Sequence, residues 1–130
     1  MKKFLIATVL FAFVFNLNTK AQTTQDKRIR VVAVFAHPDD ADSKMSGTAV
    51  LLAKMGVAVK FVALTNGDAG HYAEGGGVLG QRRRAEAQRA AKKYGIDEYV
   101  VLNNHDGELL PDLNVRMQVI REIRKWNADV

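Results

Sequence analysis

The chain has 130 residues, no cysteine and a formal net charge of +5 at pH 7. Three of its lysines lie in the first 21 residues, which contain no acidic residue, so the rest of the chain has a net charge of only +2. So small a positive charge argues against a nucleic-acid partner. The lack of cysteine excludes disulfides, and the length suits one modest domain.

The first 21 residues have the pattern of a secretory signal peptide. Lys2 and Lys3 form a positive start, residues 4–15 an apolar core, and residues 19–21 a cleavage site of the small-x-small type. The apolar run is short for a bilayer span and no second run follows it, so we expect an exported protein without a stable membrane span. The alternative is an uncleaved membrane anchor. Residues 22–28 are polar and predict a disordered lead-in.

From residue 29 onwards, strand and helix patterns alternate. They predict strands at 31–36, 57–65 and 99–102, helices at 43–55, 81–94 and 112–126, and the start of a fourth strand at 128–130. This alternation predicts a Rossmann-like α/β fold, in which a mostly parallel sheet lies between layers of helices. Because the sequence stops as the fourth strand begins, we expect a truncated fold with an exposed apolar edge, prone to aggregation or dependent on further sequence.

Polar residues are concentrated in the loops that follow the three predicted strands. Parallel strands bring their carboxyl ends to one edge of the sheet, where the ligand crevice of such folds lies. The return loops around Gly56 and Gly95 are short and plain, so we expect the three polar loops to converge on one site. The residues concerned are His37, Asp39, Asp40 and Asp42 after the first strand, residues 65–71 after the second, and residues 103–109 after the third.

The first polar loop has the residue types of a metal site. An apolar, β-branched run ends in His37, Pro38, Asp39 and Asp40, and the proline stops the strand because it lacks an N–H group. Adjacent aspartates repel each other unless solvent, a helix N-terminus or a cation takes up the charge. Histidine with aspartate suits a first-row metal, zinc foremost, and leaves one aspartate free as a base. The alternative is that the aspartates turn the chain and cap the next helix.

The second polar loop, residues 66–80, contains three successive glycines at 75–77 but no Gly-Lys-Ser/Thr, which argues against a phosphate-binding P-loop. It is either a mobile lid or a plain flexible loop. His71 within it is either a surface residue or a substrate contact.

Three arginines at 82–84 open the next helix, and because they point in different directions, at least one should face the crevice.

Residues 36–40, Ala-His-Pro-Asp-Asp, are followed by a helix that carries Gly47 and Thr48. This string resembles the signature of the PIG-L/LmbE-like de-N-acetylases, zinc enzymes that remove acetyl from N-acetylglucosamine-type substrates. The resemblance runs from about residue 29 to residue 130. It implies that His37 and Asp40 are metal ligands and that Asp39 is the general base.

The resemblance also implies residues that bind the substrate. The family's R-x-x-E pattern falls on Arg83 and Glu86, so Arg83 would donate to sugar hydroxyls and Glu86 would hold it in place; the alternative is a solvated, salt-bridged helix face. Asp106 matches an aspartate that contacts the sugar, although Asp106 and Gly107 equally form a common turn pair.

The sequence departs from the family pattern at two points. The commoner motif has glutamate directly after the paired aspartates, where this chain has Ala41 followed by Asp42. The family takes its third zinc ligand from a histidine motif after the fourth strand, which would lie beyond Val130, and catalytic zinc usually has three protein ligands. Asp42 is a candidate for a supporting role at the metal site.

These observations predict the N-terminal part of an exported, zinc-dependent deacetylase that acts on an N-acetylated amino sugar or its glycoconjugate. Two alternatives stay open. The chain would be a carbohydrate-binding remnant if it has kept Arg83 and Asp106 without a working metal centre. It would be a magnesium-dependent sugar-phosphate phosphohydrolase if the aspartate cluster binds the harder cation.

Overall fold

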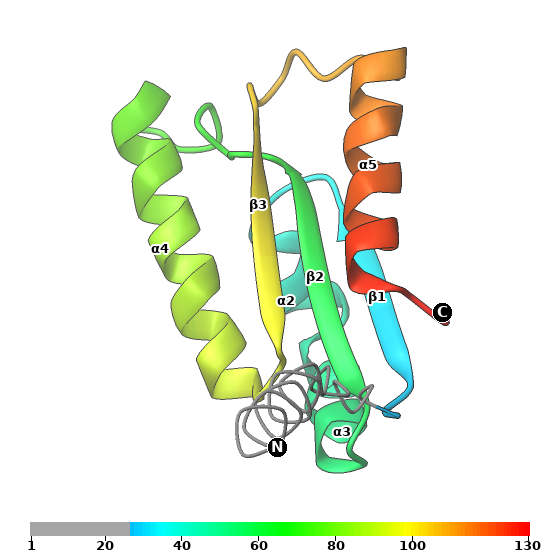
Figure 1. Ribbon diagram of the computed structural model, residues 1–130. Coiled ribbons are helices and arrows are strands. Elements are labelled where there is room, and N and C mark those ends of the chain that lie inside the picture. The colour runs from blue at the N-terminus through cyan, green and yellow to red at the C-terminus, as the bar shows by residue number, and fades with distance from the viewer. Residues whose placement is uncertain (1–26) are drawn as a thin grey trace, which may run out of the picture.

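The computed structural model describes residues 27–130, so the predicted signal peptide and most of the predicted lead-in lie outside the described residues. This range contains three strands and four helices, whose arrangement is drawn in Figure 1. In chain order they are β1 (Arg30–Phe35), α2 (Asp40–Lys44), α3 (Ser46–Lys54), β2 (Ala58–Thr65), α4 (Gly76–Tyr94), β3 (Glu98–Asn104) and α5 (Leu113–Trp126). Among the described helices, none combines the length and the apolar character that a bilayer span requires.

The three strands form one parallel sheet with β2 in the middle, in the order β1-β2-β3. Residues 128–130 run along the outer edge of β1, where the Val32 N–H donates to the Val130 carbonyl at 2.9 Å and the Asp129 N–H donates to the Arg30 carbonyl at 2.8 Å. The predicted α/β fold with a parallel sheet is therefore confirmed. The segment predicted to start a fourth strand lies beside β1 and bonds to it, but its three residues form no regular strand.

One face of the sheet is covered by α2, α3 and α4, and the apolar core lies beneath these helices (Figure 1). Phe61 of β2 is fully buried there, with its ring edge-on to Phe35 at 5.4 Å and to Tyr99 at 5.5 Å between ring centroids. Small residues such as Ala49 on α3 and Ala87 on α4 complete this core. Their small side chains let the helices pack close to the aromatic rings.

The opposite face is covered by α5, and here the sequence pattern is less simple. Lys60 of β2 is buried, and its Nζ lies 2.6 Å from Glu122 and 3.0 Å from Glu98. The buried residues of α5 are Glu122 and Trp126. Four apolar residues of α5, spaced three or four positions apart, instead stay largely exposed, with relative exposures between 37% and 73%; they are Leu113, Met117, Ile120 and Ile123.

The single helix predicted at 43–55 is wrong in detail, because the structure has two helices that meet at Met45. The first helix starts at Asp40, directly after Asp39, and the second starts at Ser46. The hydroxyl of Ser43 donates to the Asp40 carbonyl at 3.1 Å, and that of Ser46 donates to the Asp42 carbonyl at 2.7 Å. Serine hydroxyls that bond to backbone carbonyls in this way bend or interrupt helices.

The helix predicted to begin at Gln81 begins instead at Gly76. The Gly76 N–H donates to the Asp68 carbonyl at 2.8 Å, which ties the start of α4 to the preceding loop. The loop between β2 and α4 is therefore shorter than the predicted lid over residues 66–80. The predicted end of α4 is confirmed, with Gly95 in the left-handed conformation (φ 72°) that glycine adopts without strain.

Candidate active site

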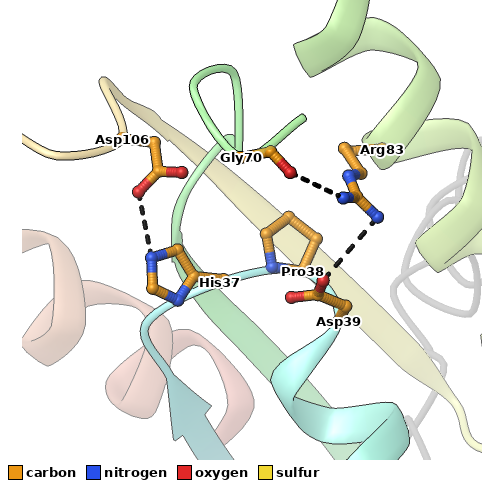
Figure 2. Close-up of a pocket in the computed structure, with 7 residues that line it drawn as sticks. His37, Pro38, Asp39, Gly70, Arg83 and Asp106 are labelled. Carbon is orange, nitrogen blue, oxygen red and sulfur yellow. Dashed lines mark hydrogen bonds and ion pairs between the residues drawn. The ribbon is translucent and has the colours of Figure 1, made fainter. Parts of the chain in front are cut away.

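The polar loops after the three strands meet in one pocket at the carboxyl edge of the sheet (Figure 2). Its volume is about 220 Å³, and its lining combines residues of all three loops with one residue of α4. The lining residues are His37, Pro38, Asp39, Gly67, Gly70, Arg83 and Asp106. The expected convergence is thus confirmed, and four of the five predicted site residues lie in the lining.

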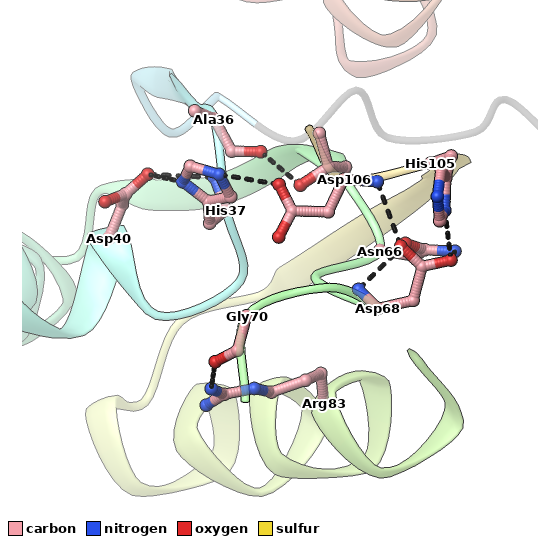
Figure 3. Close-up of polar contacts among 10 residues, drawn as sticks. Ala36, His37, Asp40, Asn66, Asp68, Gly70, Arg83, His105 and Asp106 are labelled. Carbon is pink, nitrogen blue, oxygen red and sulfur yellow. Dashed lines mark hydrogen bonds and ion pairs between the residues drawn. The ribbon is translucent and has the colours of Figure 1, made fainter. Parts of the chain in front are cut away.

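The fifth predicted residue, Asp40, lies next to His37 as the first residue of α2 (Figure 3). Its Oδ2 accepts the backbone N–H of His37 at 2.8 Å and lies 3.3 Å from Nδ1 of the imidazole ring. Asp40 therefore holds the loop at the end of β1 and at the same time directs a carboxylate oxygen towards the ring nitrogen.

The spacing of these two atoms fits two ligands of one metal ion. The bonds that zinc forms with nitrogen and oxygen ligands are about 2.0–2.1 Å long. In a tetrahedral arrangement, bonds of this length place two ligand atoms about 3.3 Å apart. His37 and Asp40 are 45% and 32% exposed in their side chains, so an ion can reach them. Within residues 27–130 no group of three or more His, Cys, Asp or Glu residues has the arrangement of a metal site. The described part of the chain therefore supplies a pair of candidate ligands.

Asp39 lines the pocket, where a dashed line joins its carboxylate to Arg83 (Figure 2). Its side chain is 59% exposed, and its Oδ2 lies 3.7 Å from Nη1 of Arg83. Arg83 also donates from Nη2 to the Gly70 carbonyl at 3.3 Å and lies 3.8 Å from Glu86, the partner that the sequence predicts. A carboxylate and a guanidinium group therefore face each other across the pocket.

Only one of the three successive arginines faces this pocket. Arg82 pairs with Glu74 at 3.2 Å, and Arg84 donates to the Val101 carbonyl at 3.2 Å. The expectation that at least one arginine faces the crevice is confirmed by Arg83.

Asp106 lies on the other side of His37, at the end of β3. Its Oδ1 is 2.9 Å from Nε2 of His37, and its side chain is only 11% exposed. The family resemblance implied a sugar contact for Asp106, whereas its contact with the imidazole was not predicted. The two residues lie 69 positions apart, and no spacing rule connects them.

Two further residues, Asp68 and His105, belong to the loops that were expected to converge, but no individual role was predicted for either of them. Asp68 is 7% exposed and accepts hydrogen bonds from the Asp106 N–H at 2.9 Å and from Asn66 Nδ2 at 3.2 Å. Its Oδ2 also lies 2.7 Å from Nδ1 of His105 (Figure 3). A signal was present in the sequence, because Asn-Gly-Asp at 66–68 and Asn-His-Asp at 104–106 follow neighbouring strands.

Hydrogen bonding shifts the pKa values of both members of this pair. The pKa of His105 is raised, because the Asp68 carboxylate accepts its ring N–H and attracts its positive charge. Burial by itself raises the pKa of Asp68, but the hydrogen bonds from the Asp106 N–H, His105 and Asn66 outweigh burial and lower it. The folded protein therefore favours the charged form of each residue.

We expect the imidazole of His105 to titrate at a higher pH in the folded protein than in the unfolded chain. Because the folded pKa of His105 is raised, the contribution of this histidine to stability is fully present below its unfolded pKa of about 6.5 and is lost as the pH rises through the folded pKa. The pKa of Asp68 is lowered, so its contribution is lost at the acid end, as the pH falls through its folded pKa. Asp68→Asn should return the pKa of His105 towards its usual value. An NMR titration of the ring protons measures this, and an unchanged pKa in the variant would contradict it.

Two tyrosine hydroxyls bond to the segment that follows β1, one to the loop before α2 and one to α2 itself. The Tyr99 hydroxyl donates to the Pro38 carbonyl, and the Tyr94 hydroxyl donates to Asp42 Oδ1 at 2.7 Å. Burial and the Asp42 carboxylate raise the pKa of Tyr94 to about 12, so this hydroxyl keeps its proton at neutral pH. Asp42 thus contacts a tyrosine and is absent from the pocket lining.

His71, the possible substrate contact, is likewise absent from the pocket lining. Its Nδ1 accepts the N–H groups of Ala73 and Glu74 at 3.2 and 3.1 Å, and its ring lies 4.7 Å from that of Tyr72. These contacts give it a local role in shaping the loop.

Comparison with known proteins gives a consistent result. The family model described as GlcNAc-PI de-N-acetylase, PIG-L, matches residues 32–130. The diacetylchitobiose deacetylase of Thermococcus kodakarensis is 32% identical over 99 residues, which make up 74% of this chain and 37% of that protein.

Among solved structures, N,N'-diacetylchitobiose deacetylase from Pyrococcus horikoshii, complexed with its inhibitor MPG, has a TM-score of 0.72 at 31% identity; the match covers 92% of this chain and 48% of that chain. The 4-carboxy-2-hydroxymuconate hydratase of Pseudomonas putida KT2440 has a TM-score of 0.69 at 22% identity, covering 77% of this chain and 44% of that chain, and shows the fold alone.

The chain spans less than half the length of either deacetylase. The family match nevertheless extends over more than half of this chain and includes the loop that carries His37, Asp39 and Asp40. The resemblance seen in the sequence is thereby confirmed, and the chain belongs to the PIG-L family of de-N-acetylases.

Proposed function

We propose that the complete protein is an exported, zinc-dependent N-deacetylase that acts on an N-acetylated amino sugar or its glycoconjugate. The observation that carries the proposal is the different placement of the three polar residues after β1. His37 and Asp40 have the spacing of two metal ligands, while Asp39 lines the pocket beside Arg83. The names of the two deacetylases support an acetylated amino sugar as the substrate class.

In this proposal His37 and Asp40 hold the zinc ion, and a third ligand comes from outside residues 27–130. When bound, zinc supplies Lewis acidity that polarises the acetamide carbonyl and acidifies the attacking water. Of this pair, His37 lines the pocket, which also holds the carboxylate of Asp39 and the guanidinium group of Arg83, 3.7 Å apart.

Asp39 is placed to act as the general base. Its exposed carboxylate takes a proton from the attacking water and passes a proton to the amine as the carbon–nitrogen bond breaks. Water and the acetamide thus become acetate and a free amino sugar. Arg83 is 22% exposed in its side chain and is held by Gly70 and Glu86, so its guanidinium group is positioned to donate to sugar hydroxyls.

The test is to incubate the complete protein with N,N'-diacetylchitobiose and N-acetylglucosamine and to measure acetate and free amine. We expect the two products in equal amounts, their loss after treatment with a chelator, and their recovery on addition of zinc. Sugar binding that is indifferent to the chelator, without acetate, would replace the proposal with a binding module. Phosphate release from sugar phosphates with magnesium, again without acetate, would replace it with a phosphohydrolase.

A further inference from the structure

We infer that Asp106 and Asp68 form a positioning chain behind His37, which fixes the ring of this ligand so that Nδ1 is the nitrogen offered to a metal ion. The inference rests on the proposed function, because it needs His37 as a ligand. It also gives Asp106 a role towards the ring that is separate from contact with a sugar.

The first step concerns the two nitrogens of His37, each of which faces a carboxylate. Nε2 lies 2.9 Å from Asp106 Oδ1, a normal hydrogen-bond distance, whereas Nδ1 lies 3.3 Å from Asp40 Oδ2. A neutral imidazole carries one N–H, and the shorter contact, which has normal hydrogen-bond length, favours Nε2 as its position. The lone pair of Nδ1 then points towards Asp40. A carboxylate that accepts the second ring N–H of a metal-binding histidine fixes both its tautomer and its orientation.

The second step concerns Asp106, whose backbone is hydrogen-bonded and whose side chain is largely buried. Its backbone N–H donates to Asp68 Oδ1 at 2.9 Å, and its side chain is 11% exposed. The side chain of Asp106 therefore has little freedom to turn away from His37.

The third step is that Asp68 is rigid enough to act as the fixed end of the chain. Asp68 is only 7% exposed, and its Oδ2 is held by Asn66 and His105. Its backbone N–H donates to Asn66 Oδ1 at 3.1 Å, and its carbonyl accepts the N–H of Gly76 at the start of α4. Asp68 thus joins the loops after β2 and β3 to a long helix (Figure 3).

The experiment measures the zinc affinity of the complete protein by competition with a chromogenic chelator. Asp106→Ala removes the acceptor of the His37 N–H and should weaken zinc binding by about 10- to 100-fold, the usual loss for an outer-shell partner. Asp106→Asn keeps an acceptor oxygen without the charge and should fall between wild type and Asp106→Ala. Asp68→Ala should weaken zinc binding less than Asp106→Ala, because Asp106 remains present but less firmly held.

Two controls separate this role from others. Glu108→Ala removes an exposed carboxylate of the same loop, and Arg83→Ala removes a pocket residue on the sugar side. Neither should change zinc affinity, although Arg83→Ala should raise the KM for the sugar. If Asp106→Ala raises KM and leaves zinc affinity at the wild-type value, Asp106 serves the sugar alone and the inference is overturned.

A second measurement does not depend on zinc or on activity. Nitrogen-15 NMR of metal-free wild-type protein should show the His37 proton on Nε2, and Asp106→Asn should retain this tautomer while Asp106→Ala populates both. A proton on Nδ1 in the wild type would overturn the inference. A wild-type protein that binds no zinc would instead refute the proposed function, so the two failures are distinguishable.

Discussion

Replacing Asp39 with asparagine is expected to lower kcat for amide hydrolysis by roughly 10²- to 10⁴-fold, the usual contribution of a general base. Asparagine has the shape of aspartate but does not accept the proton of the attacking water. Asp39 lies outside the contact between His37 and Asp40, so zinc should stay bound with unchanged stoichiometry. The measurements are kcat from acetate release and the zinc content of the purified complete protein.

The same substitution should have little effect on folding. The only ion-pair contact recorded for Asp39 within the described residues is with Arg83 at 3.7 Å, and the side chain is 59% exposed. Exposed pairs of this kind contribute about 0–1 kcal/mol.

Asp42→Asn is the matched control, since Asp42 lies in α2, the short helix that directly follows Asp39, but contacts Tyr94. It should turn over at close to the wild-type rate. Turnover retained in Asp39→Asn would exclude Asp39 as the base, and loss of zinc from that variant would make it a ligand.

The general plan of the site could be predicted because it depends on topology. Alternating strands and helices imply a parallel sheet, and a parallel sheet brings the loops after its strands to one edge. His37, Asp39 and Asp106 therefore reach one pocket even though Asp106 is far from the others in sequence.

The contacts between these side chains could not be predicted in the same way. The hydrogen bond between His37 and Asp106 depends on loop conformations after β1 and β3, two strands that do not pair with each other. The backbone link from Asp68 to Asp106 depends in turn on the turn at Gly67, whose φ of 69° is favourable only for glycine. Spacing rules describe strands and helices, whereas these contacts come from turns.

Helix boundaries were wrong where local bonds compete with the regular pattern. Periodicity does not distinguish one helix from two when Ser43 and Ser46 bond to backbone carbonyls at the junction. The early start of α4 has a similar cause, because a loop carbonyl at Asp68 accepts the first N–H of a glycine-rich turn. Glycines at 75–77 suggested a flexible loop, yet two of them lie in the helix.

Lys60→Met is expected to lower the free energy of unfolding by about 3–5 kcal/mol, the usual cost of removing one partner of a buried ion pair. Lys60 is 1% exposed, and its Nζ lies 2.6 Å from Glu122, whose side chain is 10% exposed. Without the ammonium group, the carboxylate of Glu122 keeps its desolvation cost and loses this partner. Urea denaturation of the complete protein measures the change, provided that unfolding is two-state.

The two partners of this pair should not be equivalent. Glu122→Gln removes one charge, but Lys60 still has Glu98 at 3.0 Å, and Glu98 is 44% exposed in its side chain. The loss of stability should therefore be smaller than for Lys60→Met. Glu98→Gln, which removes only this exposed partner, should cost about 0–1 kcal/mol.

The double variant Lys60→Met with Glu122→Leu tests whether the loss in Lys60→Met comes from a stranded charge or from lost packing. Trp126 and the rest of α5 stay in place, and two apolar side chains of similar volume fill the space of the pair. Replacing a buried ion pair as a whole is often neutral or stabilising. We therefore expect the double variant to recover most of the stability that Lys60→Met loses. If it is as unstable as Lys60→Met, the burial of Lys60 matters for its shape and for its contact with Trp126, whose ring centroid lies 5.7 Å from Nζ.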